Sequence, residues 1–103
     1  AEKVVAVAPQ HYKAWYNLAI AYNKLRKLGP EIKAYKMALK GRPNYPQALY
    51  NLAYAYEEKK DTAAAIKIWT RYIQVASKLP TEQQYLERAK GELARLIKAR
   101  VKP

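Results

Sequence analysis

Apolar side chains recur at helical spacing through most of the chain. Trp15, Leu18, Ala19 and Tyr22 occupy positions i, i+3, i+4 and i+7, so they lie on one stripe of an α-helix. Two further stripes with helical spacing are formed by Ile32, Tyr35 and Leu39 and by Ile66, Trp69 and Ile73. No run of alternating β-branched residues points to a sheet. The pattern therefore predicts an all-α fold.

The chain also repeats itself after 34 residues. The stretch WYNLAIAY at residues 15–22 returns as LYNLAYAY at residues 49–56, with six of eight positions identical. The match continues into the next helical stripe, where Ile32 and Lys33 recur as Ile66 and Lys67. A period of this length indicates a solenoid of stacked helix pairs, because each pair alone leaves apolar surface that a neighbouring pair must cover.

These positions resemble the tetratricopeptide repeat family. The first unit matches its pattern at Trp15, Leu18, Ala19, Tyr22, Tyr35, Ala38 and Pro43, and the second at Leu49, Leu52, Ala53, Tyr56, Ala65, Trp69 and Tyr72. The resemblance implies helix–turn–helix repeats stacked as a right-handed superhelix. Ala19 and Ala53 would lie where two helices touch, because only a small side chain allows so close an approach.

The resemblance divides the chain into four parts. We expect residues 1–8 to be the second helix of a truncated preceding repeat, so that the chain is a fragment of a longer array. Residues 12–45 and residues 46–79 are the two predicted repeats. Residues 81–100 are the predicted C-terminal capping helix, which we expect to start with a capping box formed by Thr81 and Gln84.

Turn residues predict where the other helices begin and end. We expect the first helix of the first unit to run on until Gly29 stops it in the left-handed conformation, with Pro30 opening the second helix. Asn44 is predicted to cap the following helix, with Pro46 in its first turn, and Asp61 to cap the helix after that.

Charge and composition limit the kinds of partner and site that this chain can have. The chain has 20 Lys and Arg against 8 Asp and Glu, a formal net charge of +12, which predicts an acidic partner. It has no Cys, which excludes disulfides and thiolate metal sites. No apolar run approaches the roughly 18 residues of a membrane helix, and the first residues do not have the pattern of a signal peptide. Nothing in the sequence indicates a compartment.

The resemblance also implies a binding surface, because in this family the first helices of successive repeats line a concave groove that holds peptides. The positions on that face are Lys13, Tyr16, Ile20, Asn23, Lys24, Gln47, Tyr50, Tyr54, Glu57 and Glu58. Tyrosines are enriched at interfaces, so we predict that this groove binds a peptide or a partner protein. The alternative is that a neighbouring repeat covers these side chains.

A second candidate surface is basic and lies on the predicted second helices. Its residues, which we call the basic outer face, are Lys33, Lys36, Lys40, Lys67 and Arg71. They support the alternative hypothesis of a nucleic-acid-associated protein. Most aromatic residues already have positions in the core or the groove, however, whereas nucleic-acid sites combine basic residues with exposed aromatics. A further hypothesis is self-association through the truncated N-terminal repeat.

Catalytic chemistry has almost no candidates. His11 is the only His and stands just before a predicted helix, and Ser77 has no nearby base. The three Gly form no phosphate-binding loop. We therefore expect no catalytic site, no metal site and no cofactor. The sequence predicts a non-catalytic scaffold or adaptor for interactions between proteins.

Overall fold

The structure, a computed structural model, describes residues 10–100. Within that range the chain forms five α-helices and one 3₁₀ turn, with no β-strand, which confirms the predicted all-α fold. In order, they are α2 (Tyr12–Lys24), α3 (Leu28–Gly41), α4 (Pro46–Lys59), α5 (Thr62–Ala76), η1 (Pro80–Glu82) and α6 (Gln83–Arg100). None of these helices is both long and apolar enough for a bilayer crossing. The helix predicted at residues 1–8, and with it the predicted self-association, lies outside the described residues.

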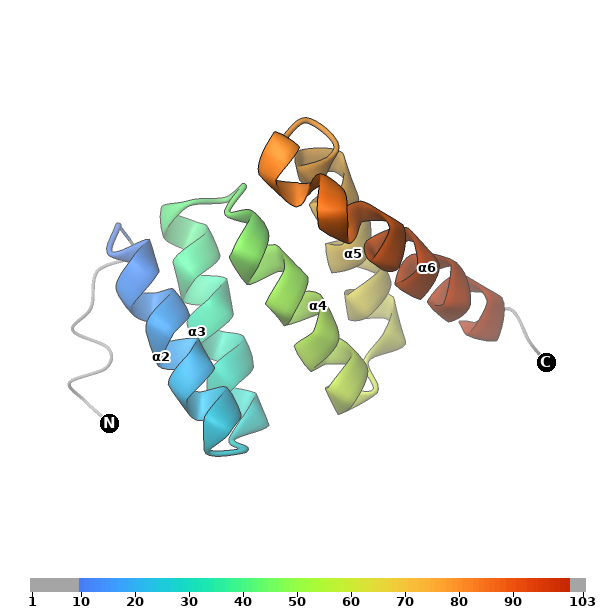
Figure 1. Cartoon of the computed structure of the whole chain (residues 1–103). Coiled ribbons are helices and arrows are strands. Elements are labelled where there is room, and N and C mark those ends of the chain that lie inside the picture. Colours follow the sequence, from blue (N-terminus) through green and yellow to red (C-terminus); the bar gives the residue numbers. More distant parts are fainter. Residues whose placement is uncertain (1–9, 101–103) are drawn as a thin grey trace.

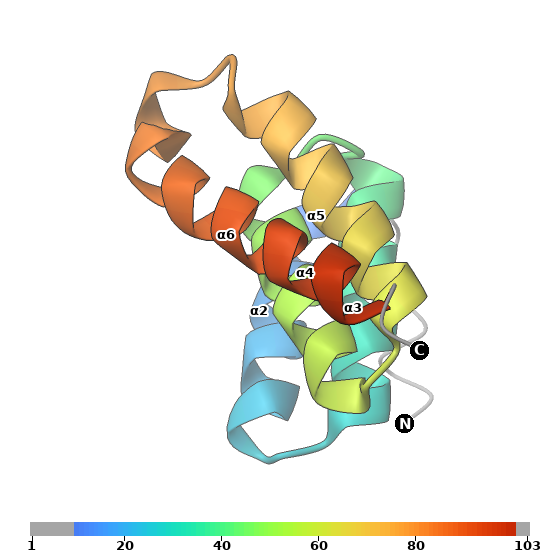
Figure 2. The same ribbon diagram turned by 90° about the vertical axis from the view of Figure 1, so that its right-hand side faces the viewer.

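The helices form two layers. Each helix packs against the next along the chain, α2 on α3, α3 on α4, α4 on α5 and α5 on α6. In Figure 1, α2 and α4 lie nearer the viewer than α3 and α5, and Figure 2 shows the two layers from the side. The pairs α2–α3 and α4–α5 fall within the two predicted repeats. The arrangement is α-solenoid-like, and the right-handed superhelix stays a prediction.

Small side chains allow the helices to approach closely. Ala19 and Ala53 are fully buried, as are Ala38 and Ala65 on the helices that follow. Around them the buried side chains form two groups, one from α2, α3 and α4 and the other from α4, α5 and α6. Tyr56 on α4 packs against both groups. The core therefore continues from one helix pair to the next, as stacked repeats require.

α2 and α4 end in the same way, each with a left-handed residue that is not Gly. The φ angle is 59° at Arg26 and 69° at Lys60. After α2, the Arg26 amide donates to the Asn23 carbonyl at 3.0 Å and the Lys27 amide to the Tyr22 carbonyl at 2.9 Å. The same two bonds close α4, 34 residues later. This is the Schellman arrangement, which satisfies the last carbonyls of a helix.

The prediction for the turn after α2 is therefore wrong. α2 ends at Lys24 and α3 already begins at Leu28, because the two Schellman bonds close the turn before the chain reaches Gly29. No Gly in the described part of the chain has a positive φ. Gly29 and Pro30 lie in the first turn of α3, where Pro is tolerated because the amides there have no partner within the helix.

Two predictions for helix starts are confirmed and one is wrong. Asp61 caps α5 by accepting a hydrogen bond from a backbone amide of its first turn at 3.1 Å, and Pro46 opens α4. Asn44 does not cap α4, since Tyr45 occupies the cap position. The Asn44 side chain instead accepts a hydrogen bond of 2.9 Å from the guanidinium of Arg71 on α5. The Asn44 side-chain oxygen, which a cap would need as its acceptor, is therefore bonded to the Arg71 guanidinium.

The predicted capping box at the start of α6 is also wrong. Thr81 lies inside the 3₁₀ turn η1, and the Gln84 side chain donates to the Thr81 carbonyl at 3.5 Å instead of reaching its amide. The η1 turn is bonded to α5 through Tyr72, whose hydroxyl donates to the Glu82 carboxylate at 2.6 Å, with both side chains buried. Tyr72 of α5 therefore holds η1 in place through a buried hydrogen bond.

Candidate functional site

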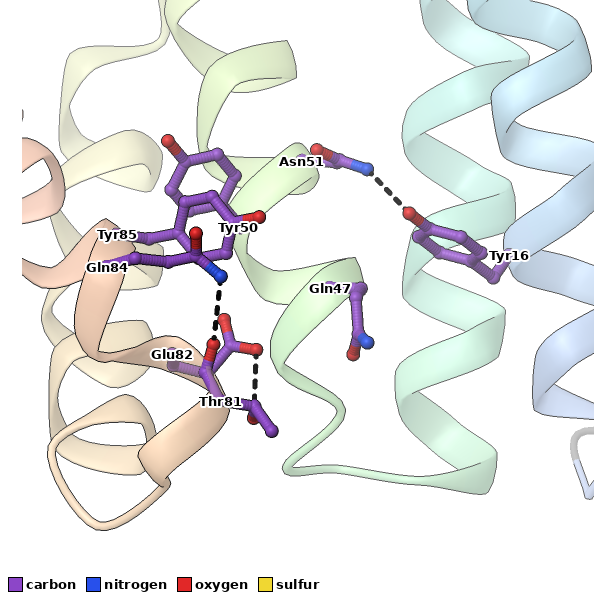
Figure 3. A pocket seen from close by; sticks show the side chains of 8 residues that line it. All are labelled: Tyr16, Gln47, Tyr50, Asn51, Thr81, Glu82, Gln84 and Tyr85. Atoms are coloured by element: carbon purple, nitrogen blue, oxygen red, sulfur yellow. Dashed lines mark hydrogen bonds between the residues drawn. The ribbon is translucent and has the colours of Figure 1, made fainter.

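Two adjoining hollows lie along the first helices. The large hollow has a volume of about 420 Å³ and lies between α2, α4 and the start of α6; Figure 3 shows its lining, which includes Tyr16, Gln47, Tyr50, Asn51, Gln84 and Tyr85. The small hollow has a volume of about 150 Å³, and its lining includes Ile20, Asn23, Glu31, Asn51, Tyr54 and Glu58. Because Asn51 lines both, the two hollows form one groove.

A hydrogen bond between Tyr16 and Asn51 joins α2 to α4 at the point where the hollows meet. The Asn51 amide nitrogen donates to the Tyr16 hydroxyl at 3.0 Å, as Figure 3 shows. The Tyr16 ring is held by Tyr45 and Tyr35, with ring centroids 5.3 Å and 6.0 Å away. These contacts fix both polar groups before any ligand arrives, which lowers the entropic cost of binding.

Aromatic rings form the wall of the large hollow on the α4–α6 side. Tyr50 has ring contacts with Tyr54, Trp69 and Tyr72 at centroid distances of 5.2–5.3 Å, and with Tyr85 at 5.5 Å. Burial, followed by the hydrogen bond with Tyr54, raises the pKa of Tyr50 to about 12. Tyr85 is 42% exposed. The aromatic surface most available to a ligand is therefore the Tyr85 ring, with Tyr50 supporting it from behind.

The groove carries negative charge. Glu31 is only 3% exposed and accepts a hydrogen bond of 3.2 Å from the Asn23 amide. Burial raises the pKa of the Glu31 carboxyl, Asn23 partly offsets the rise, and the carboxylate of Glu58 adds to it. Glu82 lines the large hollow, and no Lys or Arg lines either hollow. The lining is therefore rich in hydrogen-bond acceptors, and Arg88 of α6 adds a cation that interacts with Tyr54 and Tyr50.

An ion-pair network next to the groove joins α4, α5 and α6, and Tyr54 of the small hollow bonds to it. The Glu57 carboxylate accepts a hydrogen bond of 2.7 Å from the Trp69 indole and pairs with Arg95 of α6. Arg95 also pairs with Glu92 at 2.6 Å, and the Tyr54 hydroxyl donates to Glu92 at 3.5 Å. These bonds tie α4 to α5 and α6. The Glu57 side chain is therefore already engaged within the fold.

Most of the predicted groove residues come together in the structure. Seven of the ten line one of the two hollows. The large hollow is lined by Tyr16, Gln47 and Tyr50, and the small hollow by Ile20, Asn23, Tyr54 and Glu58. Lys13 and Lys24 are exposed but line neither hollow, and Glu57 belongs to the network with Arg95. Their role in binding stays a prediction.

Sequence reasoning missed the part of the groove that η1 and α6 supply. Thr81, Gln84 and Tyr85 line the large hollow. Thr81 and Gln84 follow Gln47 and Tyr50 by 34 residues, so extending the repeat period past residue 79 would have placed them on the groove face. This spacing was not used, because residues 81–100 were interpreted only as a capping helix.

The paired helices that recur every 34 residues define an α-helical repeat protein. Two family models, both described as tetratricopeptide repeat, match residues 1–46 and 34–67, and the chain belongs to this family. No curated protein matches the chain. Repeats of this family generally mediate interactions between proteins and are typically non-catalytic.

Proposed function

We propose that this protein is a non-catalytic scaffold that binds a peptide segment of a partner protein in the groove of α2, α4 and α6. The observation that carries the proposal is the pair of adjoining hollows, into which amides and tyrosine hydroxyls face without a core side chain filling the space. The bond between Tyr16 and Asn51 holds their centre in one geometry.

The chemistry of the lining favours a segment that offers hydrogen-bond donors and one aromatic or apolar side chain. Tyr85 and Tyr50 provide a ring surface for that side chain. Glu58, exposed beside the buried Glu31, favours an amide, Lys or Arg of the partner over a carboxylate at the small hollow. The acidic partner that the net charge predicts has a better complement among the lysines of α3 and α5.

A phage-displayed library of random peptides, selected on the immobilised chain, tests the proposal. Selected peptides are then titrated by fluorescence anisotropy against the wild type and the variant Gln47→Arg, which places a long cationic side chain at the edge of the large hollow. Gln74→Arg is the matched control, because Gln74 is an exposed Gln on α5, outside the groove. We expect binding to weaken at least about ten-fold for Gln47→Arg and less than about two-fold for Gln74→Arg, which is about 1.4 kcal/mol against a few tenths.

Two results would contradict the proposal. One is that selection on the full chain enriches no binding peptide. The other is that the enriched peptides bind Gln47→Arg as tightly as the wild type, which would place their site elsewhere. Circular dichroism of each variant checks that the substitutions, both at exposed positions, leave the helices intact.

A further inference from the structure

A third hollow lies on the other layer, between α3 and α5 and above α4. Its volume is about 460 Å³, and its floor is apolar, formed by Leu39, Leu52, Tyr56 and Ile68. Leu52 is almost fully buried, whereas the other three are only partly buried. We call this feature the outer hollow. It shares no lining residue with the groove of α2, α4 and α6.

Lysines form the rim of the outer hollow. Lys36 and Lys40 stand on α3, Lys67 stands on α5, and all three are exposed. No Asp or Glu lines this hollow, and none of the ion pairs within residues 10–100 involves these lysines. Three uncompensated positive charges therefore surround an apolar floor.

The basic surface continues along α5. Arg71 lies one helical turn after Lys67, and a further hollow of about 420 Å³ begins there, with Arg42 and Lys78 among its lining residues and again no Asp or Glu. From Lys67 to the end of α5 at Ala76 the helix advances about 14 Å at 1.5 Å per residue. The basic surface is thus long enough for a peptide segment of several residues.

We propose that this surface binds an acidic amphipathic segment of a partner protein. Its apolar side chains would enter the outer hollow, and its Asp or Glu carboxylates would meet Lys36, Lys40 and Lys67. Burial of apolar area supplies affinity at roughly 25 cal/mol per Å². The lysines select negative charge and speed the encounter. Charge complementarity thus identifies the chemistry of the occupant, and the apolar floor distinguishes it from a simple polyanion.

A nucleic acid fits this surface less well. Its phosphates would pair with the lysines, but its polar backbone would leave the apolar floor of the outer hollow in contact with water. Binding to single strands also relies on exposed aromatic rings on which bases stack. Tyr56 is the single aromatic residue that lines the outer hollow, and it is partly buried against both core groups. The partner is therefore inferred to be a protein segment.

The test uses a fluorescein-labelled peptide of about 14 residues with Leu at helical i, i+3, i+4 and i+7 spacing and Glu at most other positions. It is titrated against the full chain by anisotropy. We expect saturable binding that weakens at least about ten-fold when the four Leu become Ser. The triple variant Lys36→Glu, Lys40→Glu, Lys67→Glu should weaken binding of the Leu peptide by at least the same factor, which is about 1.4 kcal/mol.

The matched control is the triple variant Lys59→Glu, Lys90→Glu, Lys98→Glu. It lowers the net charge by the same six units, from +12 to +6, at exposed positions that line none of the four hollows described above. We expect it to change binding less than about three-fold, because charges beyond a Debye length are screened. Gln47→Arg should leave this binding unchanged, which separates the outer hollow from the groove.

Four results would overturn the inference. The Leu peptide fails to saturate below about 1 mM, or the Ser peptide binds as well as the Leu peptide. Both triple variants lose binding equally, which would make the effect one of net charge alone. Finally, an oligouridine probe binds more tightly than the Leu peptide, which would identify the surface as a nucleic-acid site.

Discussion

Replacing Tyr72 by Phe should destabilise the protein more than any other removal of a single hydroxyl that we describe. Tyr72 is fully buried and Glu82 is 6% exposed, and the hydroxyl donates to the carboxylate at 2.6 Å. Burial, together with this bond to Glu82, raises the pKa of Tyr72. The only other side-chain donor to the carboxylate within the described residues is the Thr81 hydroxyl, at 3.4 Å. Phe keeps the ring and removes the main partner of a buried charge.

The size of the loss follows from the kind of bond. A hydrogen bond to a charged group contributes about 1.5–3 kcal/mol, and an unsatisfied buried carboxylate adds a desolvation cost. We therefore expect Tyr72→Phe to lower the free energy of unfolding by about 2–3 kcal/mol. Because a domain of this size loses about 4–8 °C per kcal/mol, the midpoint of thermal unfolding should fall by about 10–20 °C.

Urea unfolding followed by circular dichroism measures the effect, with Tyr56→Phe as the matched control. Tyr56 is a partly buried tyrosine whose hydroxyl has no hydrogen-bond partner among the described residues. Its loss should therefore cost less than about 0.5 kcal/mol. Glu82→Gln, which keeps a neutral acceptor, should cost about 1 kcal/mol.

A double-mutant cycle decides whether the bond itself is responsible. Tyr72→Phe combined with Glu82→Met removes both partners, so its cost should fall below the sum of the two single changes by about 1–2 kcal/mol. If Tyr72→Phe costs less than about 0.5 kcal/mol, or if the two changes are additive, the argument from a charge-assisted bond that anchors η1 is refuted.

Three further predictions concern the turns and the response to pH. Arg26→Gly and Lys60→Gly should each stabilise the protein by about 1 kcal/mol in urea unfolding, because Gly adopts positive φ without strain; a loss of stability would show that these side chains make contacts worth more than the strain. Asp61→Ala should cost about 1 kcal/mol and Asp61→Asn much less, since Asn keeps the capping oxygen; equal costs would contradict a cap. The urea concentration at the unfolding midpoint should decrease as the pH rises from 10 to 12, because the unfolded chain loses the Tyr50 proton near pH 10 while the folded protein keeps it until about pH 12. Tyr50→Phe should make this decrease with pH smaller, and an unchanged decrease would contradict the raised pKa of Tyr50.

The helix pairs could be predicted from the sequence, but the turns between them could not. Helical stripes recur because every repeat must bury the same face, so one strong pattern appears twice in the chain. The turn after α2 follows from backbone bonds to the Tyr22 and Asn23 carbonyls, which any residue can form if it tolerates a positive φ. Sequence rules give that position to Gly, and the chain uses Arg26 instead.

The site was predictable only where it follows the repeat period. Gln47 and Tyr50 are on the groove face because helical geometry places them opposite the core stripe. Glu31 has no such signal, since its burial depends on the Asn23 amide across the α2–α3 turn.

Most of the carboxylates in hydrogen bonds that hold the fold together lie on the groove side of the molecule. No ion pair within the described residues involves the lysines that line the outer hollow on α3 and α5. The carboxylates that accept hydrogen bonds holding helices or turns together are Glu31, Glu57, Asp61, Glu82 and Glu92. The screening length at physiological salt is about 8 Å, and the shortest extent of the molecule is 20 Å. A partner on one layer therefore interacts chiefly with the charges of that layer. Rising salt should weaken binding of the acidic Leu peptide at the outer hollow more than it weakens binding of groove-selected peptides, because three exposed lysines surround the outer hollow whereas hydrogen bonds and ring contacts dominate the groove. A common salt dependence would mean that the two faces do not act separately.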